Sequence, residues 1–271
     1  MAQDYASWSP YHYTLDNPIR FIDPDGRSVE ADIYNSNGQW IGTDNVDDGR
    51  VFVSNTTNDE TLSVIDASLL VNIHDAIDSR GGSSGAGLTQ LPVNHNELQL
   101  LAASVFGEAD QTGVVREESF GIASAIVNNY NARLADPRGA DVTFAGTILT
   151  IANAATDGNI RFGLFQANTP ADRNENLGMT TAMAGAINAV SGGVDYSNGA
   201  TGWDGSDLRT NSHRFGLNIA DPSHDIYNVG DRPLMQRENG SLYRRQTTAA
   251  HGGTVFMRIH PDFVQGGAPA Y

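Results

Sequence analysis

The chain has 271 residues, 39% of them hydrophobic and 18% charged, which suffices for one large domain or two smaller ones with buried cores. Its 16 basic and 32 acidic residues give a net charge of −16, and this negative field disfavours nucleic acid as a partner. Cysteine is absent, which excludes disulfides and thiolate chemistry, and no apolar run approaches the length of a membrane span.

The first zone, residues 5–27, is rich in aromatic residues and proline and ends in the turn-forming run Asp23-Pro24-Asp25-Gly26. We expect an extended, turn-rich arm here. The first residues have neither a basic start nor an apolar stretch, so a secretory signal is not expected. Export would then depend on another part of a longer chain or on a dedicated machine.

The second zone, residues 28–87, predicts β structure followed by a helix. Asn37-Gly38 is a strong turn signal for one hairpin, and residues 47–49 predict the turn of a second hairpin that leads into 51–53. Apolar residues between 59 and 78 recur every three or four positions, which indicates a helix. The glycine- and serine-rich run at 81–87 predicts a flexible linker.

The third zone begins with a predicted amphipathic helix. Asn94 and Glu97 have the spacing of a capping box, and apolar residues from Leu98 to Ala109 follow at helical intervals. Glu108 lies on the shoulder of this apolar stripe, where a carboxyl group can be partly desolvated, as a general acid requires. An ordinary surface glutamate near a helix end would fit the same spacing.

Three further helices are expected after this one. Apolar residues from Phe120 to Leu134 have helical spacing, residues 143–149 continue the helical pattern, and residues 183–190 form an alanine-rich helix. Taken with the hairpins, these helices predict an α+β protein with a mainly α-helical domain behind a small β-rich segment.

Residues 7–27 resemble the end of the Rhs core of polymorphic toxins, in which a β-rich shell encloses a variable toxin. The resemblance rests on the ordered run of residues 7–13 and 17–27. It implies that residues 1–27 end an Rhs core, that the residues after Arg27 are the variable toxin, and that the chain is part of a longer protein. The Rhs shell and a cognate immunity protein would then be its partners.

Residues 106–109, followed by the helix at 119–130, resemble the cell-wall hydrolase family that includes the spore-cortex-lytic enzymes. Residues 143–149, 162–168 and 199–203 follow in the order of that family, and 162–166 also resemble a cleft element of lysozymes and lytic transglycosylases. This resemblance implies a lysozyme-like domain that cleaves the glycan strands of peptidoglycan.

The resemblance also implies the roles of individual residues. Glu108 would be the catalytic general acid, while Gln166, Thr201, Trp203 and Asp204 would bind substrate, with Trp203 stacking on a sugar. Asp204 and Asp157 are the candidates for a second carboxylate; without one, the C6 hydroxyl of muramic acid would attack, as in a lytic transglycosylase. This outcome is slightly favoured over muramidase hydrolysis. The chain departs from the family at Asn129, where the family usually has arginine.

Two alternatives remain open at this stage. The tail after Asp207 contains His213, His224, His251 and His260, which could serve a metal-dependent amidase or peptidase, although no tight ligand spacing such as HExxH is present. A non-enzymatic structural tip is the second alternative. Neither a metal nor a cofactor is predicted for the favoured function.

The expected organisation is therefore an Rhs core end at 1–27, a spacer and linker at 28–87, and a lysozyme-like hydrolase domain at 88–271. A fragment that begins near Leu88 is expected to fold alone. The protein is expected to act after secretion or delivery into the periplasm of a target bacterium.

Overall fold

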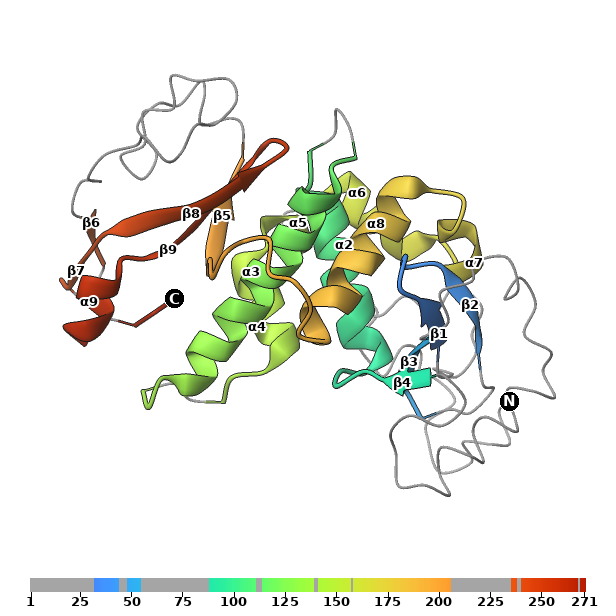
Figure 1. Cartoon of the computed structure of the whole chain (residues 1–271), viewed down its shortest axis with the longest axis horizontal. Helices are drawn as coiled ribbons and strands as arrows, with labels where there is room; N and C mark the ends of the chain where they lie inside the picture. The colour runs from blue at the N-terminus through green and yellow to red at the C-terminus, as the bar shows by residue number, and fades with distance from the viewer. Residues whose placement is uncertain are drawn as a thin grey trace.

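The computed structural model describes residues 32–43, 48–54, 88–110, 114–138, 141–156, 158–205, 235–237, 240–267 and 269–271. In its well-defined parts 47% of residues are helical and 21% are in strands, so the expected mixture of helices and strands is confirmed. The expected arm at 1–27, helix at 59–78 and linker at 81–87 lie outside the described residues. Figure 1 shows a helical body with a β-sheet at each end.

The described helices are α2 (His95–Glu108), α3 (Arg116–Ala135), α4 (Phe144–Ile151), α5 (Asn153–Thr156), α6 (Ile160–Ala167), α7 (Pro170–Arg173), α8 (Leu177–Val190) and α9 (Pro261–Gln265). The described strands are β1 (Asp32–Asn35), β2 (Trp40–Thr43), β3 (Val51–Ser54), β4 (Leu88–Gln90), β5 (Gly202–Asp204), β6 (Met235–Gln236), β7 (Leu242–Tyr243), β8 (Arg245–His251) and β9 (Thr254–Ile259).

The helices predicted in the third zone are confirmed. Asn94 caps α2 through the expected capping box with Glu97, and the side chain of Thr143 caps α4. Helices α2 and α3 pack against α8, which is buried from Met179 to Ile187. Gly185 allows the closest approach, since a Cβ atom there would lie 3.0 Å from the backbone oxygen of Ser119.

The first predicted hairpin is confirmed and the second is wrong. Strands β1 and β2 pair in antiparallel fashion around Gly38, whose φ of +78° requires glycine. Strand β3, however, pairs in parallel with β1 and in antiparallel fashion with β4, so the sheet order is β2-β1-β3-β4. All four residues of β3 are buried, as expected of a central strand rather than a hairpin arm.

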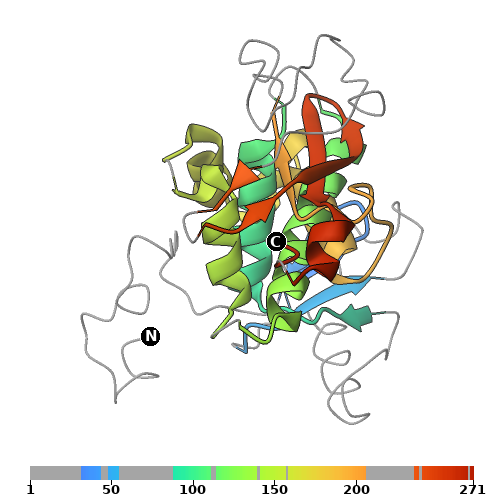
Figure 2. The same cartoon turned by 90° about the vertical axis from the view of Figure 1, so that its left-hand side faces the viewer.

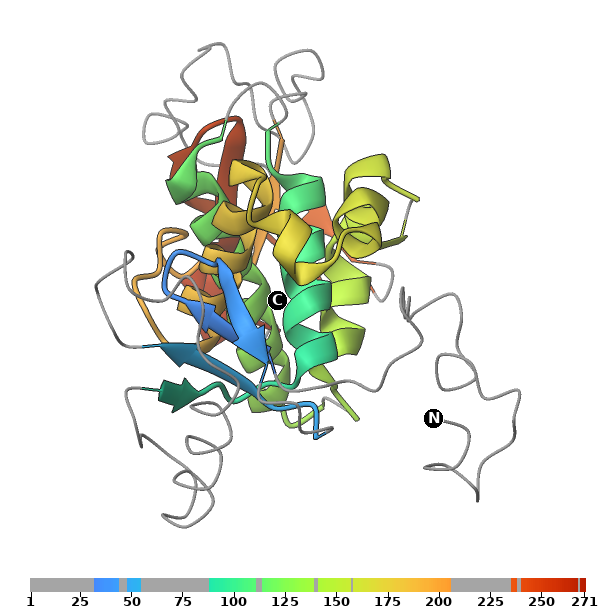
Figure 3. The same cartoon turned by 90° about the vertical axis from the view of Figure 1, so that its right-hand side faces the viewer.

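This N-terminal sheet shares one hydrophobic core with the helices. Tyr34, Val51 and Val53 belong to the same buried cluster as residues of α2, α3 and α8. Figure 3 shows the sheet lying against the helical body. The boundary expected at residue 87 therefore falls between two paired strands, β3 and β4, and does not separate two packed bodies.

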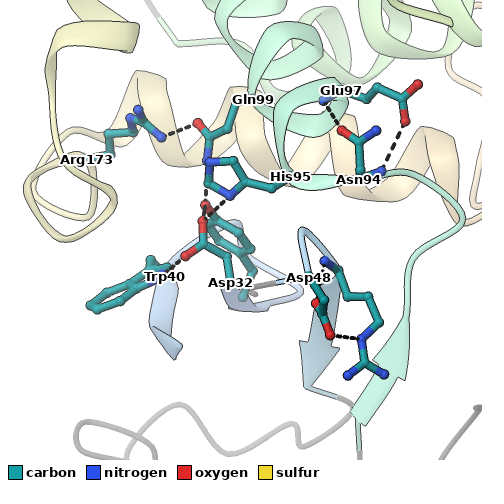
Figure 4. A network of polar contacts seen from close by, with 10 residues as sticks. Asp32, Trp40, Asp48, Asn94, His95, Glu97, Gln99 and Arg173 are labelled. Atoms are coloured by element: carbon teal, nitrogen blue, oxygen red, sulfur yellow. Dashed lines mark hydrogen bonds and ion pairs between the residues drawn. The ribbon is translucent and has the colours of Figure 1, made fainter. Parts of the chain in front are cut away.

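A polar network reinforces this contact (Figure 4). The buried carboxylate of Asp32 accepts hydrogen bonds from Tyr34 Oη and Trp40 Nε1, both at 2.9 Å, and its Oδ2 lies 2.9 Å from Nδ1 of His95 at the start of α2. Gln99 of α2 donates to the Tyr34 hydroxyl at 2.8 Å and accepts from Arg173. Burial, and secondarily the Asp32 charge, raises the pKa of Tyr34 well above its ordinary value, so the phenol remains a neutral donor.

Strands β8 and β9 of the C-terminal tail form a second sheet with β5, in the order β5-β9-β8. Figure 1 shows the β8–β9 hairpin on the opposite side of the helical body from the N-terminal sheet, and in Figure 2 the hairpin faces the viewer. Phe256 of β9 packs against α3 at Gly121, where a Cβ atom would lie 2.5 Å from its ring. Among the described residues no helix is both long and apolar enough to cross a membrane.

Candidate functional site

Glu108 is the last residue of α2, and its carboxylate is held from two sides. Oε1 accepts a hydrogen bond from the backbone N–H of Ala154 at 2.5 Å, and Oε2 accepts one from Trp203 Nε1 at 3.1 Å. Ala154 belongs to α5 and Trp203 to β5, so three separate segments meet at this carboxylate. The side chain is half-buried, and its orientation is fixed before any substrate binds.

Trp203 is brought to Glu108 by the pairing of β5 with β9, in which Trp203 lies opposite Phe256. Its indole N–H donates a hydrogen bond to the Glu108 carboxylate, whereas the family resemblance implied that the Trp203 ring stacks on a sugar. Trp203 is half-buried and packs against the edge of the hydrophobic core. The structure thus brings Trp203 into contact with Glu108 through the indole N–H.

Asp204 does not join this pair. Successive side chains of a strand point to opposite faces, so Asp204 points away from the face that Trp203 presents to Glu108. Its Oδ1 accepts from the N–H of Gly205 at 3.0 Å, and its charge acts on Arg245. Burial lowers the pKa of the Arg245 guanidinium, while Tyr243 and Asp204 act in the opposite direction. The other candidate for a second carboxylate, Asp157, lies outside the described residues.

Thr201 is bound to the C-terminal residues of the chain. Its hydroxyl donates to the carbonyl oxygen of Ala270 at 3.2 Å, and its own carbonyl oxygen accepts from Asn129 Nδ2 at 2.7 Å. Arg133 donates to Asn129 Oδ1 at 2.6 Å. Asn129, where the resembled family usually has arginine, thus holds the segment that leads into β5.

Gln166 lies in the last turn of α6. The start of that helix is next to Glu108, since Asn159 Nδ2 donates to the carbonyl oxygen of Gly107 and Phe162 packs on the same glycine. Gln166 is seven residues beyond Asn159, about 10 Å along the helix axis. Gln166, which was expected in the cleft, therefore lies about two helical turns beyond the start of α6. Phe162 lies next to the end of α2 instead.

A second glutamate, Glu118 on α3, is fully buried at 0% exposure and fixes the β8–β9 hairpin. Its Oε1 accepts from Gly253 N at 3.1 Å and Thr254 Oγ1 at 2.7 Å, and its Oε2 accepts from Asp110 N at 3.1 Å. Burial raises the pKa of Glu118, and these three hydrogen bonds counteract the rise only in part. Sequence reasoning missed this residue because two of its partners, Gly253 and Thr254, lie 135 and 136 residues further along the chain.

The histidines of the described tail have structural roles. His251 Nε2 lies 3.0 Å from the carbonyl oxygen of Tyr196, and His260 caps α9. No group of three or more His, Asp or Glu residues within the described part of the chain is arranged to hold a metal ion. His213 and His224 lie outside the described residues.

No known protein family, characterised protein or solved structure matches the chain. The function is therefore inferred from its own residues and their arrangement.

Proposed function

We propose that the chain is an antibacterial effector that cleaves the glycan backbone of peptidoglycan, with Glu108 as the general acid and base. The observation that carries the proposal is the half-buried Glu108 carboxylate, held between Ala154 N and Trp203 Nε1 at the end of α2. A catalytic carboxyl group needs a fixed direction and partial shielding from water, and this one has both. The ordered resemblance to the lysozyme-like cell-wall hydrolases supports the same role.

The hydrogen bonds at Glu108 are compatible with proton transfer. Each carboxyl oxygen has two lone pairs, so Oε2 can carry a proton on one while it accepts from Trp203 with the other. In the first step this proton goes to the glycosidic oxygen as the bond from the muramic acid C1 breaks. The leaving sugar departs with a free hydroxyl group, and Glu108 becomes a carboxylate.

The second step depends on the nucleophile. In the favoured route the C6 hydroxyl of the same muramic acid attacks C1 and returns its proton to Glu108, which yields a 1,6-anhydro sugar. In the alternative route water attacks C1 directly, with a second carboxylate as its base, or the second carboxylate attacks C1 and water then hydrolyses the resulting covalent glycosyl intermediate. The placement of Asp204 away from Glu108 supports the first route.

The test is digestion of purified peptidoglycan by the full chain and by Glu108→Gln. The substitution keeps the size of the side chain and one of its two acceptor oxygens but removes the transferable proton, so turnover should fall by about 10²–10⁴. Glu117→Gln, an exposed first-turn glutamate of α3, is the matched control and should retain activity. Near-normal turnover of Glu108→Gln would overturn the assignment.

Mass spectrometry of the products separates the remaining possibilities. Anhydro glycan fragments indicate a lytic transglycosylase and reducing-end fragments a muramidase. Released stem peptides, lost on addition of a chelator, would instead indicate the metal-dependent amidase or peptidase, and no products would indicate a structural tip.

The proposed site of action is the periplasm of a target bacterium, after delivery as the toxin part of an Rhs protein and with a cognate immunity protein protecting the producer. Expression with a periplasmic signal should therefore round and lyse cells, whereas expression in the cytoplasm should be harmless. Cytoplasmic killing with degraded nucleic acid would contradict this proposal and favour a nuclease.

A further inference from the structure

A groove of about 440 Å³ lies between the β1–β2 turn and the first turns of α3 and α8. Its size falls within the range of ligand sites, about 300–1,000 Å³. Nothing in the proposed mechanism uses it. Its polar lining comes from three separate elements, in the side chains of Asn37, Gln39, Arg116, Thr180 and Thr181.

The wall formed by the β1–β2 turn is held rigidly. At Gly38 a Cβ atom would lie 2.1 Å from the Thr180 carbonyl oxygen, so the turn is in direct contact with the backbone of α8. Asn35 Oδ1 accepts from the backbone N–H groups of Asn37 and Gln39, both at 3.0 Å. Asn35 Nδ2 also donates to Gln39 Oε1 at 2.8 Å, which fixes that side chain. Because this wall is already ordered, binding of a ligand in the groove costs little conformational entropy.

The chemistry of the lining fits a saccharide. Amide and hydroxyl groups can bind sugar hydroxyl and acetamide groups, and Leu177, 70% exposed, offers an apolar surface for a sugar face. Among the described lining residues Arg116 is the one cation, held over the Phe120 ring at 4.4 Å, and it suits a carboxylate such as the lactyl group of muramic acid. A polyanion would be repelled by the net charge of −16.

A smaller hollow lies where the end of α2 meets the starts of α3 and α8. Its lining includes Ala109, which follows Glu108, and Gly178, which follows Leu177 of the groove. The same hollow is lined by Val115 and Ser119, the residues immediately before Arg116 and Phe120. The helix ends that carry Glu108 and the groove residues Arg116 and Leu177 therefore meet around this hollow.

We propose that this groove binds the sugar units of the glycan strand that continue beyond those held at Glu108. The proposal rests on the proposed function and adds to it an extended binding site for polymeric substrate. A strand held here remains close to Glu108 after each cleavage, which favours long substrates over short ones.

The kinetic test uses Leu177→Asp in the full chain, which removes the apolar surface and places a negative charge beside the proposed site of the muramic acid carboxylate. The ratio of KM for long glycan strands to KM for the shortest cleavable fragment should rise five- to tenfold. Val194→Asp is the matched control, because Val194 is similarly exposed at 63% and does not line the groove. Equal ratios in the two variants, with unchanged melting curves, would overturn the proposal.

Direct binding separates this proposal from the proposed function. Peptide-free glycan tetrasaccharides of alternating N-acetylglucosamine and N-acetylmuramic acid are titrated into Glu108→Gln, and the amide resonances of residues 37–39 and 177–181 are followed by NMR. Shifts that saturate, and that Leu177→Asp abolishes, support the groove even if the wild-type chain cleaves nothing. Cleavage by the wild-type chain without such shifts would refute the groove and leave the role of Glu108 intact.

Discussion

Replacing Gly38 with alanine perturbs the contact through which the β1–β2 turn rests on α8. Gly38 has a φ of +78°, where an alanine costs about 1–2 kcal/mol through its Cβ atom alone. The new Cβ would also lie 2.1 Å from Thr180 O and 2.4 Å from Ala184 N. Because both are backbone atoms of a buried helix, the turn has to move, at an overpacking cost of about 1–3 kcal/mol. The two terms together predict a loss of about 2–5 kcal/mol in the free energy of unfolding.

Gly49→Ala is the matched control for the conformational term. Its φ is +67°, and an added Cβ meets nothing within 4 Å, so only the cost of about 1–2 kcal/mol applies. Urea titrations followed by far-UV circular dichroism measure both variants, and the difference between them isolates the steric contact. If Gly38→Ala lost no more stability than Gly49→Ala, the turn would not rest on α8 and the sheet would not be part of the same folded body.

Three further predictions concern the site and its support. Burial raises the pKa of Glu118 above its ordinary value of 4.5, so the stability that this carboxyl group adds is present below pH 4.5 and is lost as the pH rises through the raised pKa. Glu118→Gln should therefore reduce the fall in the urea midpoint between pH 4.5 and neutrality. An unchanged pH profile would contradict the burial argument. Trp203→Phe removes a hydrogen bond to Glu108 worth about 1.5–3 kcal/mol. The kcat on peptidoglycan should therefore fall about 10- to 100-fold with little change in KM. A rise in KM alone would instead favour stacking of the Trp203 ring on a sugar. In a fragment of residues 88–271, strand β4 lacks its partner β3. The fragment should therefore precipitate on gel filtration or unfold without cooperativity on thermal melting. A soluble, active fragment would support a domain boundary at residue 87.

Local signals predicted the helices because those signals act over a few residues. The capping box of Asn94 and Glu97 and the apolar stripe behind it locate α2, and they place Glu108 at its end. The turn at Gly38 is equally local, since a positive φ between two short strands favours glycine. In each of these cases the deciding contacts lie within four positions in the sequence or follow from backbone sterics alone.

The errors arose where partners are distant in sequence. Strand β3 follows β2 but pairs with β1 and β4, a choice made by the burial of Val51, Phe52 and Val53 on both faces of the sheet. The turn signal Gly252-Gly253, which comes before the apolar run Val255-Phe256-Met257, could have indicated the β8–β9 hairpin. No pattern could have shown that its turn binds Glu118, which is 135 residues away from Gly253.

The arrangement around Glu108 depends on this hairpin. Glu108 and Glu118 lie at the two sides of the junction between α2 and α3, and each binds one part of the C-terminal sheet: Glu108 binds Trp203 of β5, and Glu118 binds the turn before β9. In the described sheet, strand β5 pairs only with β9. Because Glu118 binds the turn before β9, it supports the strand that carries the Trp203 indole to Glu108. Disruption of the hairpin would therefore free the Glu108 carboxylate from its indole partner while the helices that carry it remained packed. The tail at residues 245–259, which the family resemblance did not cover, thus belongs to the support of the proposed catalytic site.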